Sequence, residues 1–206
     1  MANASLFKFR SKMEGGGARP NLFEVSIPDL PDAATAEGAL WDTDSQDKFQ
    51  FLAKATNLPA SNVAEVVVPF RGRNFKVAGD RTIDPWTVTI INDEDFRFRT
   101  VFEQWANAIA KLDNGTGATD PSSYQSDAFV KQLGRGNVRE SRSNGTDGMD
   151  SEMVTLRQYK FEMIWPSLVS DIALSYDDGN AIEQFDVTFQ VQTYSVTPEG
   201  GGPAIV

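Results

Sequence analysis

Short runs of alternating apolar and polar residues are the feature of this sequence that most limits its fold. The clearest run covers residues 185–192, where Phe and Val alternate with Asp, Thr and Gln. Side chains alternate in this way along a β-strand with one face in the core and one in water. The pattern predicts strands at residues 21–27, 49–56, 63–70, 74–78, 86–91, 127–133, 156–165 and 185–192.

A single segment has helical rather than strand periodicity. Its apolar residues recur every three or four positions, which gives a stripe wide enough to cover a sheet. We predict that Asn92 caps this helix, that the acidic residues 93–95 form its first turn, and that Asn114-Gly115 ends it. The stripe consists of Phe98, Val101, Phe102, Trp105, Ile109 and Leu112.

These elements predict an α+β fold that is mainly β, because strands and helices do not alternate along the chain. We expect an antiparallel β-sandwich or barrel-like fold with one packed helix and long loops. A length of 206 residues favours one domain spanning 1–206. Within it we expect a flexible N-terminal arm at 1–19, a long acidic loop at 29–48, a long polar connection at 134–152 and a flexible tail at 197–206.

The composition argues against catalysis and cofactor binding. The chain has no Cys and no His, which removes disulfides, thiolate sites, the commonest general base and the commonest metal ligand. The carboxylates at 93–95 and at 177–178 are interpreted as a helix start and a turn rather than a metal site. We therefore expect no enzyme activity, no cofactor and no metal.

Charge and hydropathy limit the partners. Nineteen basic residues against 29 acidic ones give a formal charge of -10, which opposes binding to nucleic acid. An alternative is that the acidity only keeps the protein in solution. No stretch approaches the ~20 apolar residues of a membrane span, so we expect a cytoplasmic protein without a membrane partner.

The middle of the chain carries a specific resemblance. VPFRGR at residues 68–73 is followed by KVAGDRT at 76–82 and WTVTIINDEDF at 86–96. LPAS at 58–61 precedes this block, and residues 159–166 and 180–188 form a C-terminal strand pair. Over residues 21–196 the chain resembles the tail tube proteins of contractile-tailed bacteriophages.

The resemblance implies both a fold and an assembly. The implied fold is shared with type VI secretion tube proteins, and the implied assembly is a stack of hexameric rings inside a contractile sheath. Sheath, baseplate, tail terminator and tape measure proteins would be partners, and genomic DNA would pass transiently through the lumen. The protein would be a virion tail component, assembled in the host cytoplasm.

Polar positions on the predicted strands are candidates for the lumen wall. A polar, weakly acidic wall would let DNA slide, whereas a wall lined with lysine and arginine would hold it. The alternative is that these residues are ordinary solvated sheet faces of a monomer. The lumen-facing candidates are Lys54, Glu162, Asp186, Thr188, Gln190 and Gln192.

A basic cluster and the acidic loop are candidates for contacts between subunits. Opposite charges on neighbouring copies would form intersubunit salt bridges. A nucleic-acid patch and a disordered acidic loop in the free subunit are the alternatives. The candidates are Arg71, Arg73, Lys76 and Arg81 on the basic side, and Asp32, Glu37, Asp42, Asp44 and Asp47 on the acidic side.

Two other functions remain open at this stage. The chain could form the tube of a related secretion or injection device, which differs in what passes through the lumen. It could also be a monomeric β-sandwich binding module. Such a module would expose aromatic side chains, whereas Trp86, Trp105 and Trp165 lie on faces predicted to be buried.

Overall fold

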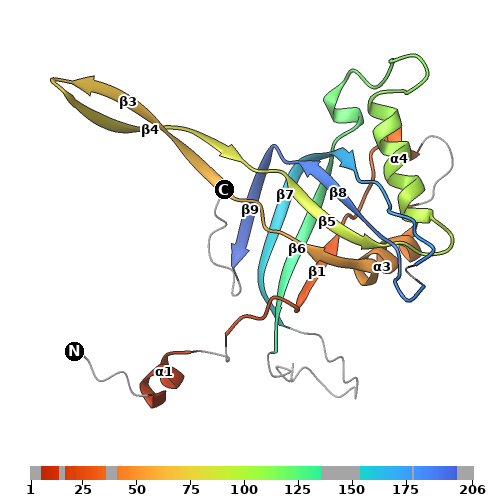
Figure 1. The fold of residues 1–206 in the computed structure, drawn as a ribbon, viewed down its shortest axis with the longest axis horizontal. Coiled ribbons are helices and arrows are strands. Elements are labelled where there is room, and N and C mark those ends of the chain that lie inside the picture. Colours follow the sequence, from red (N-terminus) through yellow and green to blue (C-terminus); the bar gives the residue numbers. More distant parts are fainter. Residues whose placement is uncertain (1–5, 14–16, 36–40, 136–153, 178, 199–206) are drawn as a thin grey trace, which may run out of the picture.

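The computed structural model describes residues 6–13, 17–35, 41–135, 154–177 and 179–198. Most strands join one seven-stranded antiparallel sheet of order β1-β6-β7-β8-β5-β2, with β9 also paired to β7 (Figure 1). The remaining two strands form a separate hairpin, β3-β4. The strands are β1 Phe23–Ser26, β2 Ala53–Thr56, β3 Ser61–Phe70, β4 Arg73–Ile83, β5 Trp86–Ile91, β6 Ser126–Gly134, β7 Val154–Val169, β8 Gln184–Gln190 and β9 Thr193–Pro198.

The mainly β, antiparallel fold predicted from the sequence is confirmed. β5 matches its predicted range, and its Trp86, Val88 and Ile90 are fully buried. β8 places Phe185, Val187 and Phe189 on the same core, while its alternate residues face outward. The two strands pair in register, with Val88 opposite Val187, so their apolar faces coincide.

The strand β7 belongs to both halves of the sheet. Its first half pairs with β6 and β9, and its second half pairs with β8. Between them the register shifts at Met163, which has a left-handed backbone with φ 55°. Such a bulge bends a strand and moves its later side chains by one position. Phe161 and Ile164 are therefore both buried, whereas Met163, which regular alternation would place on the same face as Phe161, is exposed.

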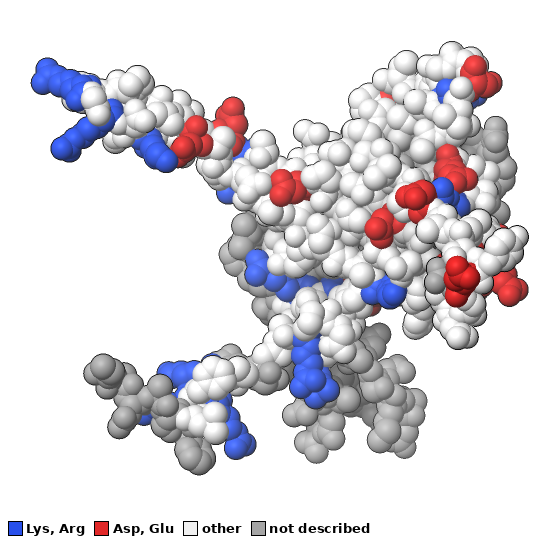
Figure 2. Space-filling view, in the orientation of Figure 1, with Lys and Arg blue, Asp and Glu red and all other residues white. Residues whose placement is uncertain are grey.

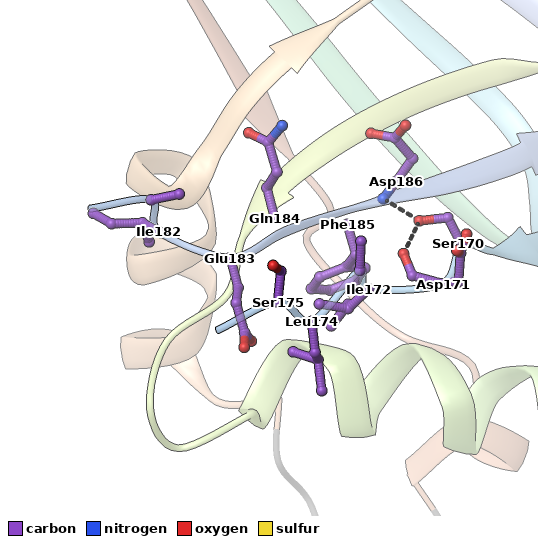
Figure 3. A pocket seen from close by; sticks show the side chains of 12 residues that line it. Ser170, Asp171, Ile172, Leu174, Ser175, Ile182, Glu183, Gln184, Phe185 and Asp186 are labelled. Carbon is purple, nitrogen blue, oxygen red and sulfur yellow. Dashed lines mark hydrogen bonds between the residues drawn. The ribbon is translucent and has the colours of Figure 1, made fainter. Parts of the chain in front are cut away.

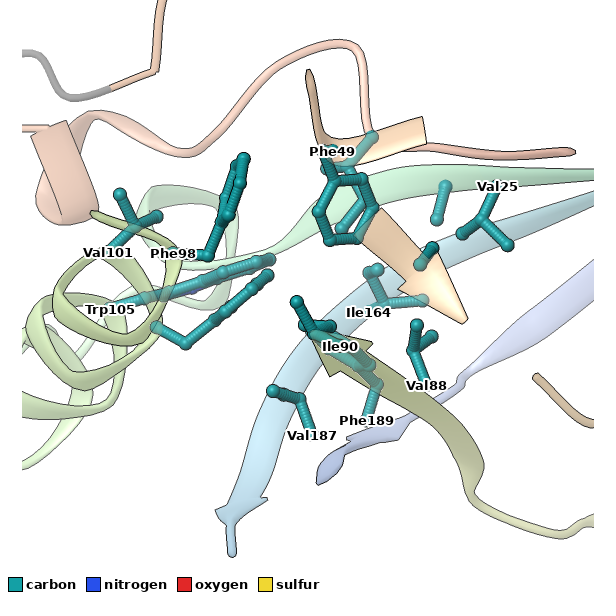
Figure 4. Close-up of a cluster of buried hydrophobic side chains, with 14 of the residues drawn as sticks. Val25, Phe49, Val88, Ile90, Phe98, Val101, Trp105, Ile164, Val187 and Phe189 are labelled. Carbon is teal, nitrogen blue, oxygen red and sulfur yellow. The ribbon is translucent and has the colours of Figure 1, made fainter. Parts of the chain in front are cut away.

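Helices cover one side of the core. The predicted helix is α4, Arg97–Ile109, and its Phe98, Val101, Phe102 and Trp105 are buried (Figure 4). Asn92 is not its cap. The backbone N–H of Asn92 bonds to Glu183 at the start of β8, and α4 instead begins after Phe96, which has φ 51°. Leu112 lies beyond the helix and is 96% exposed.

A second packed helix replaces part of the expected acidic loop at 29–48. That segment carries the short helix α2, Asp32–Thr35, and most of α3, Thr43–Leu52. The prediction of a strand from Phe49 is therefore wrong up to Leu52. Phe49 is fully buried and packs with Trp41 and Phe98, with ring centroids 5.5 and 5.7 Å away. These contacts hold the segment as a helix although its sequence is polar.

The ends of the chain also differ from the expectation of uniformly flexible segments. The arm at 1–19 contains a helix, α1, Leu6–Lys12. The tail predicted from residue 197 begins inside β9, which continues to Pro198. Most of the connection at 134–152, from residue 136 onward, lies outside the described residues. Among the helices that the structure describes, none has the length and apolar character to cross a bilayer.

Candidate assembly surface and channel face

The β3-β4 hairpin projects from the body of the molecule as a long two-stranded ribbon (Figure 1). Every residue of β3 is exposed. In the strand register, Val66 lies opposite Val77, and Val68 lies opposite Phe75. Directly opposed side chains lie on the same face, so these four and Phe70 form one apolar face, which we call the hairpin face. Phe70 and Phe75 are 64% and 65% exposed.

The other side of the hairpin is mixed in character. It carries Val67 opposite Lys76 and Glu65 opposite Ala78. Lys76 Nζ lies 2.6 Å from a carboxylate oxygen of Glu65, in an ion pair within the same hairpin. An isolated two-stranded ribbon has only marginal stability in water. An exposed apolar face on such a ribbon indicates a site of interaction with another protein surface.

The tip of the hairpin is basic. Arg71 and Gly72 form a two-residue turn with φ 49° and 80°, the backbone that a tight type I′ hairpin requires. The Arg71 guanidinium lies 5.3 Å from the centre of the Phe70 ring. In Figure 2 blue side chains gather at this tip, red ones lie nearer the base of the hairpin and on the body, and further blue ones lie on the lower part of the molecule. The four basic candidates Arg71, Arg73, Lys76 and Arg81 all belong to the hairpin and are exposed.

The acidic candidates divide into two groups. Asp42 caps α3: its Oδ1 accepts a hydrogen bond from the Ser45 backbone at 2.9 Å and pairs with Arg97 at 3.0 Å. Bonds from the Ser45 side chain and backbone, followed by that from Arg97, lower the pKa of Asp42 to about 2. Asp32, Asp44 and Asp47 are exposed on α2 and α3. Glu37 lies outside the described residues.

The carboxylates at 93–95 bind a lysine of the same chain. Lys48 Nζ lies 2.5 Å from Asp93 and 3.0 Å from Asp95, joining α3 to the segment before α4. The hydrogen bond to Asp93, followed by that to Asp95, raises the pKa of Lys48. Within the described ranges, no group of three or more acidic residues is arranged to hold a metal ion.

Four lumen candidates lie on one continuous outer face of β2, β5, β8 and the second half of β7. We call Lys54, Thr87, Thr89, Asp186, Thr188 and Gln190 the polar strip. Hydrogen bonds cross it: Lys54 to Gln184 at 2.7 Å, Thr89 to Asp186 at 2.6 Å and Gln190 to Ser167 at 3.3 Å. The Thr87 and Thr188 hydroxyls are 3.2 Å apart. The strip holds one cation and one anion, so its charge is balanced.

The other two lumen candidates lie apart from the strip. Glu162 is on the first half of β7, before the Met163 bulge, and pairs with Lys160 at 3.0 Å. Gln192 is exposed between β8 and β9. Trp165 is only half-buried, since the bulge brings it into register with Gln190 on the outer face. The buried tryptophan missed from the sequence is Trp41, which lies in the segment interpreted as a loop.

The profile of the family described as phage tail tube protein matches residues 18–197. The chain belongs to this family of phage tail tube proteins. It is 34% identical over 179 residues to tail tube protein gp19 of Enterobacteria phage T4, covering 87% of this chain and 91% of that protein. It is 27% identical over 132 residues to a tail tube protein of Serratia phage KSP90, covering 63% and 71% of the two chains.

Solved structures place this tail tube protein in a wider fold group. A chain of the anti-feeding prophage baseplate aligns with a TM-score of 0.55 and 8% identity, covering 89% of this chain and 97% of that one. A sheath/tube terminator of an extracellular contractile injection system aligns at 0.53 with 11% identity, covering 88% and 96%. At these identities the likeness concerns the fold alone.

Proposed function

We propose that this chain is the structural subunit of a contractile-phage tail tube, which closes into hexameric rings that stack around a DNA-conducting lumen. Membership of the tail tube family supports this proposal. The single observation that carries it is the hairpin face, because a ribbon with this much exposed apolar surface needs a protein partner. In a tube made of one protein, that partner is another copy.

In this proposal the hairpin of one copy lies on a neighbouring copy. Burying the hairpin face supplies affinity, and the basic tip supplies orientation. The complementary surface is the exposed acidic group on α2 and α3, formed by Asp32, Asp44 and Asp47. Asp42 contributes less, because Arg97 and Ser45 of its own chain already bind its carboxylate.

The polar strip is the proposed lumen wall. Its side chains bond to one another across the strands, so few donors remain to bind phosphates. A balanced charge gives DNA no cationic track, which is the condition for sliding without retention. Sheath, baseplate, terminator and tape measure proteins are the further partners of the proposed tube, and the virion tail is its location.

The two earlier alternatives fit less well. An injection-device tube shares the fold, but identity to four injection-system chains is 8–13%, against 34% to a phage tail tube protein. A monomeric binding module would use exposed aromatics on the sheet. Instead Trp86, Trp105 and Phe189 form part of the buried core.

Isosteric substitutions on the hairpin test the proposal directly. Val66→Thr with Val68→Thr places hydroxyls on the hairpin face and keeps β-branched shape. The matched control is Val67→Thr, on the opposite side of the same strand. Because each buried hydroxyl without a partner costs about 1–3 kcal/mol, the double variant should raise the concentration needed for tubes roughly tenfold or more.

The readout is negative-stain electron microscopy with light scattering after gel filtration, with purified baseplates added as seeds where free subunits stay monomeric. Circular dichroism checks that each variant is folded. Wild-type protein should give hollow tubes, as should the Val67→Thr control. A wild-type chain that remains monomeric at high concentration and with baseplates would show that the tube proposal is wrong.

A further inference from the structure

A cavity of about 510 Å³ lies between the end of β7 and the start of β8 (Figure 3). Its lining is mixed: the apolar side chains are those of Ile172, Leu174, Ile182 and Phe185, and the polar ones include Asp171, Ser175, Glu183, Gln184 and Asp186. Of these, Phe185 is buried, whereas Leu174 and Ile182 are 79% and 75% exposed. Exposed rim side chains of this size indicate a site that a further apolar group covers.

The rim of this cavity is acidic. Asp171 and Glu183 line it, and among the described residues neither is in an ion pair. Glu183 accepts a hydrogen bond from the neutral Asn92 amide at 3.0 Å, so its charge is not neutralised. A ligand that matches this site has an apolar surface with cations beside it.

The helix α1 has that chemistry. Leu6 and Phe9 of α1, and Met13 directly after its end, follow the three- and four-residue spacing of one helical face and are 78%, 63% and 43% exposed. At 100° per residue, Arg10 and Lys12 flank this apolar face on its two sides. Within the described part of the chain, neither cation is in an ion pair.

We propose that α1 of one copy docks into the 170–186 cavity of a second copy. Leu6 and Phe9 pack against the apolar side chains of the cavity, while Arg10 and Lys12 reach Asp171 and Glu183. In Figure 1 α1 lies far from β8 of its own chain, so the match joins different copies. This inference rests on the proposed tube and adds a second contact, independent of the hairpin.

Cysteine cross-linking between copies tests the contact. The sequence contains no Cys, so introduced thiols are the only ones present. Tubes assembled from a mixture of Met13→Cys chains and Ser175→Cys chains are oxidised mildly and run on a denaturing gel. We expect a covalent dimer. Chains carrying Leu112→Cys replace Ser175→Cys as the control, because Leu112 is 96% exposed and lies outside the cavity.

Substitutions on α1 test whether the cross-link comes from specific docking or from random collision of the two cysteines. Leu6→Ser with Phe9→Ser, in the Met13→Cys chain, should reduce the dimer roughly tenfold or more, since both apolar anchors are lost. Lys8→Ser on the opposite side of α1 is the matched control and should leave it unchanged. Arg10→Glu with Lys12→Glu should also weaken the dimer, and Asp171→Lys with Glu183→Lys in the partner should restore it.

Each remaining outcome decides against the inference. If Ser175→Cys cross-links to Met13→Cys no faster than Leu112→Cys does in assembled tubes, the proposed α1 contact is wrong. The tube proposal itself is not affected by that result. If a chain that carries both Met13→Cys and Ser175→Cys cross-links only within itself, α1 occupies the cavity of its own chain. Rapid maleimide labelling of Ser175→Cys in tubes leaves the cavity open to some other ligand. If no tubes form, the proposed function fails, and this inference fails with it.

Discussion

At the scale of single residues, the carboxylate of Asp42 fixes the start of α3, a helix that the sequence pattern does not predict. It accepts bonds from the backbone and hydroxyl of Ser45, which is fully buried, and it pairs with Arg97 at the start of α4. The N-cap thus satisfies a free backbone donor of α3 and ties α3 to α4. The aromatic packing beneath α3 depends on this start.

Removing the carboxylate should weaken the fold in a pH-dependent way. The folded pKa of Asp42 is about 2, below its ordinary 3.8, so its stabilisation is present above pH 3.8 and is lost as pH falls toward 2. Asp42→Ala should lower the melting temperature by about 2–4 °C at pH 6. The difference from wild type should shrink in melts between pH 4 and pH 2. An equal difference at every pH would contradict a role for the charge.

At the scale of elements, α3 is held by packing rather than by helix propensity. Phe49 is fully buried among Trp41, Phe98 and Phe102, whereas Phe51 on the same helix is 83% exposed. Phe49→Ala should therefore cost about 3–5 kcal/mol in urea unfolding, from lost burial and the cavity left behind. Phe51→Ala is the matched control and should change stability little. Similar losses from both would mean that α3 does not pack as described.

The elements that the sequence predicts well are those in which the spacing of apolar residues matches the face that is buried. β5 and β8 alternate because they have one face in the core, and α4 has a helical stripe because it covers that core. α3 escaped prediction because its burial depends mainly on Phe49, Ser45 and the distant Trp41. Regular alternation does not describe β7 beyond Glu162, because a bulge adds a residue that no sequence pattern marks.

The candidate surfaces likewise divide into one that the sequence pattern predicts and one that it does not. The polar strip could be expected from alternation, since Asp186, Thr188 and Gln190 oppose buried neighbours. The hairpin face could not, because the run Val66–Val68 has no alternation and resembles a buried strand. Only the register shows that Val66 and Val68 share a face with Phe75 and that nothing in the described part of the chain covers it.

At the scale of the whole molecule, the polar strip makes a prediction about the assembled tube. Asp186→Lys turns its one cation and one anion into two cations in every copy. Such tubes should retain at least about tenfold more short double-stranded DNA in co-sedimentation, with release as salt rises. Asp113→Lys, on the exposed segment after α4, adds the same charge elsewhere and is the control. Equal retention by both would place the strip outside the lumen.

The long strand β7 has a mechanical consequence for the whole molecule. It pairs with β6 and β9 along its first half and with β8 along its second, and one covalent backbone runs through the bend at Met163. Strand hydrogen bonds resist shear together, whereas separate sheets can slide past each other across side-chain contacts alone. A force applied to one half of the sheet is therefore transmitted to the other half through the backbone of β7. The two halves should resist deformation together.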